Sequence, residues 1–310
     1  MSILESGWRW RYRLARDART ESARRRLAAL AKRGELVRVV PGAYLEPRDW
    51  EGLDPRARHI ALLRAVALTA DRPVVFSHVS AAALWGLPIV GHLPSRADAL
   101  GSRAQRGSTR FVRRHIEPTR RFVEIDGLLV TELPRTVVDV ARLPDLERSV
   151  AITDAALHRA GPAEQSMRDL LETELARVPT RHGSARARHV LDFADGRADS
   201  PGESVSRLTM DRLGLDSPVL QQEFPREGGG RWVVDFWWPE QGVIGEFDGA
   251  AKYLDPAWRG ARSAEQVVLD EKRREDELRS GCRGFARWGW EEARSPARLA
   301  VRLRRAGLSV

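Results

Sequence analysis

The sequence has little cysteine, few lysines and no long apolar run. Cys282 is the single cysteine of 310 residues, which excludes an internal disulfide framework and makes an intracellular, cytoplasmic protein the simplest expectation. No stretch approaches the roughly 18 apolar residues that span a membrane, so no membrane partner is expected. The opening residues, MSILESGWRWRYRLARD, are charged and do not resemble a secretory signal.

Zinc and nucleophile chemistry also lack support in the sequence. The seven histidines show no metal-ligand spacing, either with each other or with Cys282. No nucleophile-elbow motif surrounds a serine.

Lysine is scarce: of the 52 basic residues only Lys32, Lys252 and Lys272 are lysines. Abundant arginine and alanine are typical of GC-rich coding and say little about function on their own. The distribution of charge is more informative. Residues 1–50 hold 12 basic and 6 acidic side chains, whereas residues 200–310 hold 18 of each. The net charge of +9 is thus concentrated near the N-terminus, which predicts an anionic partner there.

The residue pattern divides the chain into three blocks, 1–58, 59–195 and 196–310. The first block ends in a linker-like stretch from Pro47 to Pro55. The second predicts a mostly helical α+β domain, with helices over 59–70, 77–85, 134–142, 146–159 and 184–193 and a strand pair over 122–131. We therefore expect a multidomain α/β protein.

The first block has the outline of a winged helix-turn-helix, a helix followed by a small hairpin. Ser22 can cap a helix that ends at Gly34, residues 35–40 and 43–45 predict strands, and Pro41-Gly42 predicts the turn between them. This predicts a recognition helix and a wing that contact DNA. The plainer interpretation is a solvated basic helix face. The predicted DNA-binding residues are Arg24, Arg25, Arg26, Lys32 and Arg33 on the helix and Arg38 on the wing.

The third block predicts the order α-β-β-β-α-β, which suits a mixed sheet flanked by helices. A helix opens at Ser200-Pro201 and runs to Leu213. The remaining elements are strands over 219–224, 232–238 and 243–248, a charged helix over 260–280, a strand over 283–290 and a last helix over 296–306.

Three carboxylates lie on two neighbouring strands of this block. Asp235 is in RWVVDFWW, and Glu246 and Asp248 are in GVIGEFDG. Residues i and i+2 of a strand share a face, so Glu246 and Asp248 point the same way, and Asp235 joins them if the strands pair. Three converging acids suit Mg²⁺ or Mn²⁺, which can activate water against a phosphodiester. Alternatively, Asp235 and Glu246 are ordinary exposed strand carboxylates and Asp248 belongs to an Asp-Gly turn.

Residues 200–310 resemble the PD-(D/E)XK nuclease superfamily, in particular the very-short-patch-repair-like endonucleases. The matching residues are Glu246 to Gly249, then Lys252, the stretch from Arg273 to Asp276, and Arg287-Trp288. The resemblance implies a restriction-endonuclease-like domain that cleaves DNA with Mg²⁺ or Mn²⁺. The sequence departs from the superfamily pattern because Glu-x-Lys is here Glu-x-Asp and the lysine is displaced.

The same resemblance implies catalytic roles for Glu203 and Lys252, beside Asp235 and Glu246. A glutamate from the first helix often completes such a site, although Ser200 to Glu203 is equally a capping box. Lys252 would stabilise developing negative charge, because lysine can exchange a proton where arginine cannot. A salt bridge between Lys252 and Asp255 is the plainer alternative.

The whole chain also resembles actinobacterial AbiEi-type antitoxins of type IV toxin–antitoxin systems. The matching stretches are 32–40, 77–88, 131–142 and 200–210. This resemblance implies DNA binding through the first block, with a nucleotidyltransferase-like toxin as partner, but not cleavage. Three functions stay open. The first is a metal-dependent endonuclease that nicks or cleaves DNA, and the second is a non-catalytic antitoxin or transcriptional repressor whose third block is inert or binds a partner. The third is a nucleic-acid processing protein that needs a partner for activity. The sequence gives neither the DNA site nor the oligomeric state.

Overall fold

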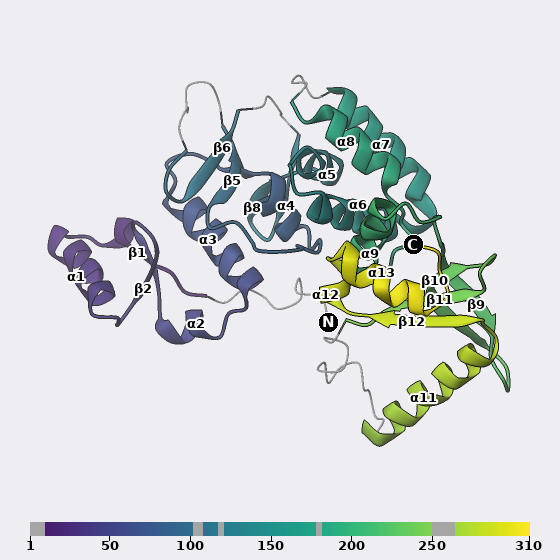
Figure 1. The fold of residues 1–310 in the computed structure, drawn as a ribbon. Coiled ribbons are helices and arrows are strands. Elements are labelled where there is room, and N and C mark those ends of the chain that lie inside the picture. The colour runs from purple at the N-terminus through teal and green to yellow at the C-terminus, as the bar shows by residue number, and fades with distance from the viewer. Residues whose placement is uncertain (1–9, 102–107, 117–120, 178–181, 250–263) are drawn as a thin grey trace. The chain divides into compact units, whose positions relative to one another are not determined.

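The computed structural model describes residues 10–101, 108–116, 121–177, 182–249 and 264–310 (Figure 1). The chain has a mixed α/β, multidomain architecture, and its described residues form three sheets. It divides into two compact units. The first unit comprises Met1–Ile152 and Gln165–Asp192, and the second comprises Thr153–Glu164 and Phe193–Val310. The sequence-predicted boundary at 195 lies close to the junction at Phe193.

The first unit begins with a helix and a small antiparallel sheet of order β1-β3-β2. Its elements are β1 (Arg13–Leu14), the 3-10 turn η1 (Ala15–Asp17), α1 (Glu21–Lys32), β2 (Val37–Val40) and β3 (Ala43–Leu45). The helix followed by a hairpin is present as expected. Within residues 10–20, β1 and η1 precede α1, so no second helix of a helix-turn-helix lies there.

The ends of α1 follow from local hydrogen bonding. Thr20, not the predicted Ser22, is the N-cap, because its backbone is extended and its Oγ1 accepts the N–H of Ala23 at 3.2 Å. At the other end Gly34 adopts φ +78°, and the N–H of Glu35 returns to the carbonyl of Leu30 at 3.0 Å. This left-handed termination favours glycine and ends the helix where the sequence predicted.

The stretch from Pro47 to Pro55 is not a simple linker. It contains helix α2 (Pro47–Glu51), with proline at its first position. Helix α3 (Pro55–Thr69) follows and is capped by Asp54. Residue 58 does not separate two cores, because Leu14 and Val39 belong to one hydrophobic cluster with Leu63 of α3. The first two predicted blocks therefore share packing within one unit.

The rest of the first unit is a five-stranded sheet of order β6-β5-β4-β8-β7 with helices. The middle block thus contains more strands than the sequence predicted. The strands over 75–76, 97–100 and 112–115 were missed because the first is only two residues long and the other two carry charged residues that obscure an apolar alternation. The strands are β4 (Val75–Phe76), β5 (Ala97–Leu100), β6 (Val112–His115), β7 (Phe122–Ile125) and β8 (Leu128–Thr131). Its helices are α4 (His78–Leu84), α5 (Leu133–Ala141), α7 (Glu164–Arg177) and α8 (Ser184–Phe193). Helix α6 (Leu146–Ala160) begins in the first unit and passes at Thr153 into the second unit, which also contains the 3-10 turn η3 (Gly161–Ala163).

The second unit has the predicted α-β-β-β-α-β order, with one short extra helix. Its elements are α9 (Pro201–Arg212), β9 (Val219–Pro225), β10 (Arg231–Trp238), β11 (Val243–Phe247), α11 (Ala264–Ser280), β12 (Gly284–Trp288), α12 (Trp290–Ala293) and α13 (Pro296–Arg305). The sheet order is β12-β11-β10-β9; β9, β10 and β11 pair antiparallel, and β11 and β12 pair parallel.

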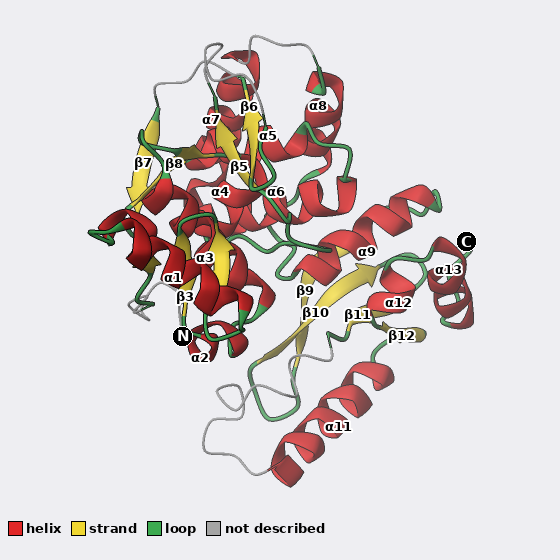
Figure 2. Cartoon of the chain, turned by 90° about the vertical axis from the view of Figure 1, so that its left-hand side faces the viewer, coloured by secondary structure: helices red, strands yellow, loops and turns green. Residues whose placement is uncertain are grey.

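Helices α9 and α11 cover opposite faces of this sheet (Figure 2). On one face Ile244 packs with Leu278 of α11. On the other, the indole N–H of Trp288 donates to Ser206 of α9 at 2.8 Å. The two faces matter for the site, because adjacent residues of a strand point to opposite faces.

None of the helices in the described residues is long and apolar enough to cross a membrane.

Candidate functional site

A basic face on helix α1 is the first candidate. At roughly 100° per residue, Arg25, Arg26, Lys32 and Arg33 fall within about 120° of the helix circumference. All four side chains are exposed, and α1 contains no fully buried residue. Arg24 is also exposed but lies outside this arc. Such a face presents its cations together on one side of the helix.

Three of the predicted DNA-binding cations are paired with acids of their own segment. Arg24 and Arg25 contact Glu21 at 3.9 and 3.3 Å, and Arg33 contacts Glu35 at 2.5 Å. These exposed pairs are weak and exchange readily with other anions.

The other three predicted cations are Arg26, Lys32 and Arg38. All are exposed, and none forms an ion pair with any residue that the structure describes. Arg38 is on β2, and α1 contacts β2. The helix and the neighbouring strand therefore offer uncommitted positive charge.

The second candidate is the set of carboxylates in the second unit. Strands β10 and β11 pair up to Phe236 opposite Gly245, which leaves Asp235 and Glu246 at the next positions of the two strands. The ladder between β9 and β10 skips Asp235, and Gln221 of β9 has φ +50° at this irregularity. One oxygen of Asp235 accepts the backbone N–H of Phe247 at 2.7 Å. Asp235 thus acts as a hydrogen-bond acceptor for the edge of β11.

Glu246 is buried and held by two arginines. It is 5% exposed. Arg274 of α11 donates to both of its carboxylate oxygens, one of them at 3.2 Å, and Arg287 of β12 donates to Oε2 at 2.9 Å. Charge-assisted bonds of this kind are stronger than neutral ones. Both oxygens of Glu246 therefore accept from guanidinium groups.

The same arginines join Glu246 to the acids of α11. Arg287 contacts Glu271 at 2.8 Å and Glu275 at 3.5 Å, and Glu275 also accepts from Arg279 at 2.7 Å. Burial alone would lower the pKa of Arg287, but the hydrogen bond and charge of Glu246 and the charges of the two α11 glutamates outweigh it, so its pKa is raised. Three carboxylates and three guanidiniums balance, which leaves no excess negative charge.

The three carboxylates predicted to converge on a metal ion do not do so. In the described part of the chain no three Asp, Glu, His or Cys side chains form a group that could hold a metal ion. The physical reason is that Glu246 turns to the arginines and Asp235 to a backbone N–H. Asp248, at the end of β11, is half-buried and joins neither. In this arrangement the residues do not fit Mg²⁺ or Mn²⁺, and the metal cofactor stays a prediction from the sequence alone.

Glu203 serves the start of helix α9. It is 2% exposed, its N–H donates to the cap Ser200 at 3.2 Å, and its Oε2 accepts the N–H of Asp199 at 3.0 Å and the side chain of Gln221 at 2.9 Å. Burial raises the pKa of Glu203, although the hydrogen bonds from Asp199, Ser200 and Gln221 oppose the shift. In a capping box the glutamate accepts the backbone N–H of the cap residue. Here Glu203 accepts the N–H of Asp199, the residue before the cap, and otherwise its contacts match the capping interpretation.

Lys252 and its alternative partner Asp255 lie outside the described residues, so the role predicted for Lys252 stays a prediction.

The first unit contains a buried polar cluster that the sequence analysis did not predict. His78, the first residue of α4, has φ +52° and is 5% exposed. Its ring stacks on that of His115, with centroids 3.6 Å apart. The Nε2 of His115 lies 2.9 Å from Asp98, which is also buried. Burial, followed by the charges of His115, Arg135 and Arg142, lowers the pKa of His78 well below its usual value.

Helix α5 supplies the charged partners of this cluster. Arg135 donates to Asp139 at 2.8 Å and contacts Glu174 at 3.6 Å. Asp139 lies 3.8 Å from Nδ1 of His78, which also lies 3.0 Å from the hydroxyl of Ser77. A hydrolytic triad would use opposite ring nitrogens for serine and aspartate, so this is not one. His78, Arg135 and Asp139 lie in the stretches 77–88 and 131–142, which carry part of the antitoxin resemblance, and this was the only sequence signal for the cluster.

Comparisons with known proteins give relatives but no function. Two curated proteins of Mycobacterium tuberculosis, "Uncharacterized protein MT2308" of strain CDC 1551 and "Uncharacterized protein Rv2248" of strain H37Rv, are each 36% identical to the chain over 167 residues. The match covers 50% of this chain and spans 60% of the length of each relative. No family model matches the chain.

A solved structure, the RV2827C protein of Mycobacterium tuberculosis, aligns with a TM-score of 0.37 and 15% identity. The alignment covers 70% of this chain and 84% of that one. A likeness at this level carries no argument about function.

Proposed function

We propose that the protein binds duplex DNA through α1 and β2 and that its second unit does not cleave DNA but serves as a scaffold or partner-binding module. The observation that carries the proposal is the exposed, unpaired set of Arg26, Lys32 and Arg38. Phosphate contacts from such side chains provide most of the affinity for DNA and do not require a metal ion.

The arginine contacts of Glu246 favour the non-catalytic role. Two guanidinium groups donate to both oxygens of Glu246, and their positive charge opposes a divalent cation at the same carboxylate. Displacing Arg274 and Arg287 would also separate two cations from the buried carboxylate that both contact. The resemblance to AbiEi-type antitoxins supports the same role, that of a repressor or antitoxin with a nucleotidyltransferase-like toxin as partner.

A salt series on DNA binding tests the proposal. The variant with Arg26→Ala, Lys32→Ala and Arg38→Ala should bind duplex DNA more weakly and reduce the slope of log K against log salt by about 2 to 3, at roughly 0.9 per phosphate contact. The matched control carries Lys272→Ala, Arg273→Ala and Arg305→Ala, which remove the same charge from exposed positions of the second unit. Equal losses in the two variants would show that only net charge matters and would refute a binding face on α1.

A metal-dependent endonuclease is the second candidate. The observation in its favour is that Asp235 and Glu246 occupy adjacent positions of two paired strands, in a unit whose main elements follow the order αβββαβ. Supercoiled plasmid incubated with Mg²⁺ or Mn²⁺ separates the two functions. Nicking by the wild type that Asp235→Ala and Glu246→Ala both abolish would establish the nuclease. Equal cleavage by all three proteins would indicate a contaminant, and no cleavage by any of them would favour the non-catalytic role.

A further inference from the structure

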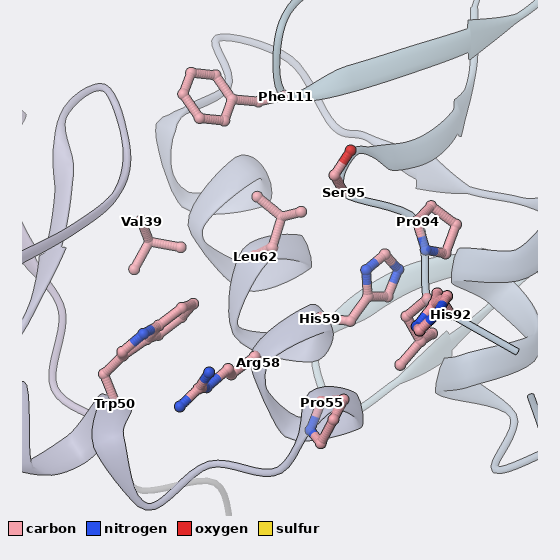
Figure 3. Close-up of a pocket in the computed structure, with 11 residues that line it drawn as sticks. Val39, Trp50, Pro55, Arg58, His59, Leu62, His92, Pro94, Ser95 and Phe111 are labelled. Atoms are coloured by element: carbon pink, nitrogen blue, oxygen red, sulfur yellow. The ribbon is translucent and has the colours of Figure 1, made fainter.

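A pocket of about 350 Å³ lies within the first unit, between α2, α3 and the segment 92–95 (Figure 3). This volume is at the small end of the range for pockets that bind small molecules. Its apolar walls come from Val39 of β2, Trp50 of α2, Leu62 of α3 and Phe111. Two aromatic rings and two aliphatic side chains favour a flat or compact apolar group.

The polar lining of this pocket is basic or neutral. Arg58, His59, His92 and Ser95 face it, and no lining residue is acidic. The guanidinium of Arg58 lies 5.6 Å from the centre of the Trp50 ring, and one N–H contacts the carbonyl of Glu51 at 3.4 Å. Among the described residues no carboxylate pairs with Arg58. Most of its five donors are therefore available to an anion.

His59 forms an uncharged part of the wall. It is 4% exposed, and its Nε2 lies 3.0 Å from the hydroxyl of Ser80. Burial lowers the pKa of His59 to about 4, against smaller opposing effects from Asp98 and a hydrogen bond to Pro94. The ring is consequently neutral near pH 7, and Arg58 is the fixed cation of the pocket.

We propose that this pocket binds a small organic anion, with a carboxylate or phosphate held by Arg58 and an apolar body set between Trp50, Leu62 and Phe111. A planar guanidinium that lies by an aromatic ring suits an oxyanion attached to a ring, because it can donate two N–H bonds and still contact the indole. A neutral molecule of the same shape gains only the apolar contacts. Ligand binding here does not depend on the proposed binding of DNA.

Titrations with benzoate, phenyl phosphate and the neutral benzyl alcohol test this site. The readout is the indole N–H resonance of Trp50, assigned with Trp50→Phe. We expect saturable shifts with an anion below about 20 mM, since a fragment-sized ligand binds with a roughly millimolar Kd. Benzyl alcohol should bind at least tenfold more weakly. The two anions distinguish a carboxylate ligand from a phosphate ligand.

Substitutions locate the charge that binds. Arg58→Gln should weaken anion binding at least tenfold, and Arg58→Lys should give an intermediate loss because lysine lacks the guanidinium fork. Arg48→Gln is the matched control, because Arg48 is an exposed arginine of α2 that does not line the pocket. The proposal is overturned by no saturable shift at Trp50 with either anion, by equal binding of benzyl alcohol, or by equal losses in Arg58→Gln and Arg48→Gln.

Discussion

A strand glutamate among apolar neighbours has the same sequence pattern whether it binds a metal ion or an arginine. Glu246 lies between Ile244 and Phe247, and its burial demands a partner of opposite charge. The partners are Arg274 and Arg287, which lie 28 and 41 residues further along the chain. At the scale of the single residue, environment rather than residue type assigns the role.

Removing the charge of Glu246 should destabilise the protein. Glu246→Gln removes the buried one of the two carboxylates that Arg274 and Arg287 share, and Glu271 remains in contact with both. We expect a loss of roughly 2 kcal/mol, less than for a fully buried pair because the arginine side chains retain 20% and 25% exposure. Urea unfolding measures it. Glu291→Gln is the control, since its pair with Arg298 is exposed and should cost under about 0.5 kcal/mol.

The opposite outcome for Glu246 would identify a metal ligand. Unchanged stability in Glu246→Gln, together with loss of Mn²⁺-induced line broadening seen in the wild type, would contradict the arginine network. A double-mutant cycle with Arg274→Gln gives the coupling directly.

The lowered pKa of His59 should make the free energy of unfolding fall as the pH becomes acidic. Its pKa of about 4 lies below the ordinary 6.5, so the unfolded chain takes up a proton between pH 6.5 and 4 that the folded chain does not. The stabilisation is fully present above pH 6.5 and is lost as the pH falls towards 4, by about 3 kcal/mol at 1.36 kcal/mol per unit. The ring resonances of His59 should titrate near pH 4 in a proton NMR series.

The variant His59→Gln isolates this effect from other groups. Burial raises the pKa of Asp154 to about 6, which acts in the opposite sense and lowers stability as the pH rises towards 6. The comparison is therefore between variant and wild type at pH 7 and pH 4.5, and His59→Gln should lose less stability between them. A ring that titrates near pH 6.5 in the folded protein would refute the prediction.

At the scale of the element, helix α9 and strand β11 approach closely. A Cβ on Gly202 would lie 2.0 Å from the ring of Phe247, which is buried. The sequence alone predicted α9, because Ser200, Pro201 and Glu203 form a helix-start signature. Only the structure shows why glycine occupies the second position of this helix.

Gly202→Ala should destabilise the protein despite the better helix propensity of alanine. The displaced ring should cost roughly 1–3 kcal/mol, against about 1 kcal/mol gained in the helix. Thermal unfolding measures the net loss. At Gly52, where φ is −76° and a Cβ meets nothing within 4 Å, the same substitution should change stability by less than about 0.5 kcal/mol. A Gly202→Ala variant as stable as the wild type would show that Phe247 moves freely.

At the scale of the whole molecule, the second unit takes a segment from the middle of the chain. Thr153–Glu164 belongs to it together with Phe193–Val310. Asp154 of this segment pairs with Arg207 of α9 at 2.9 Å and accepts the N–H of Asp195 at 2.8 Å. A domain cut at the sequence-predicted position 196 would therefore lose a buried partner of Arg207.

Two fragments test this division. Fragment 196–310 should have a free energy of unfolding roughly 3 kcal/mol lower than that of fragment 145–310, because Arg207 loses its buried acid. It should therefore unfold at a lower urea concentration. Both fragments contain the same six tryptophans, so one fluorescence signal serves for both. Equal midpoints would mean that residues 153–164 contribute nothing to the second unit.

The sequence by itself determined the order and type of most elements. Short-range signals caused this success: the apolar periodicity of 59–70, the Ser200-Pro201 helix start, and the alternation in 232–238 all act between near neighbours. It missed β4 to β6, whose few residues become strands only when they pair with distant segments. The tertiary structure alone decided that Glu246 meets two arginines, that His78 stacks on His115, and that Arg58 faces an acid-free pocket. The reason is that the free energy of a buried charge depends on partners far away in the chain, and a local sequence pattern does not identify those partners.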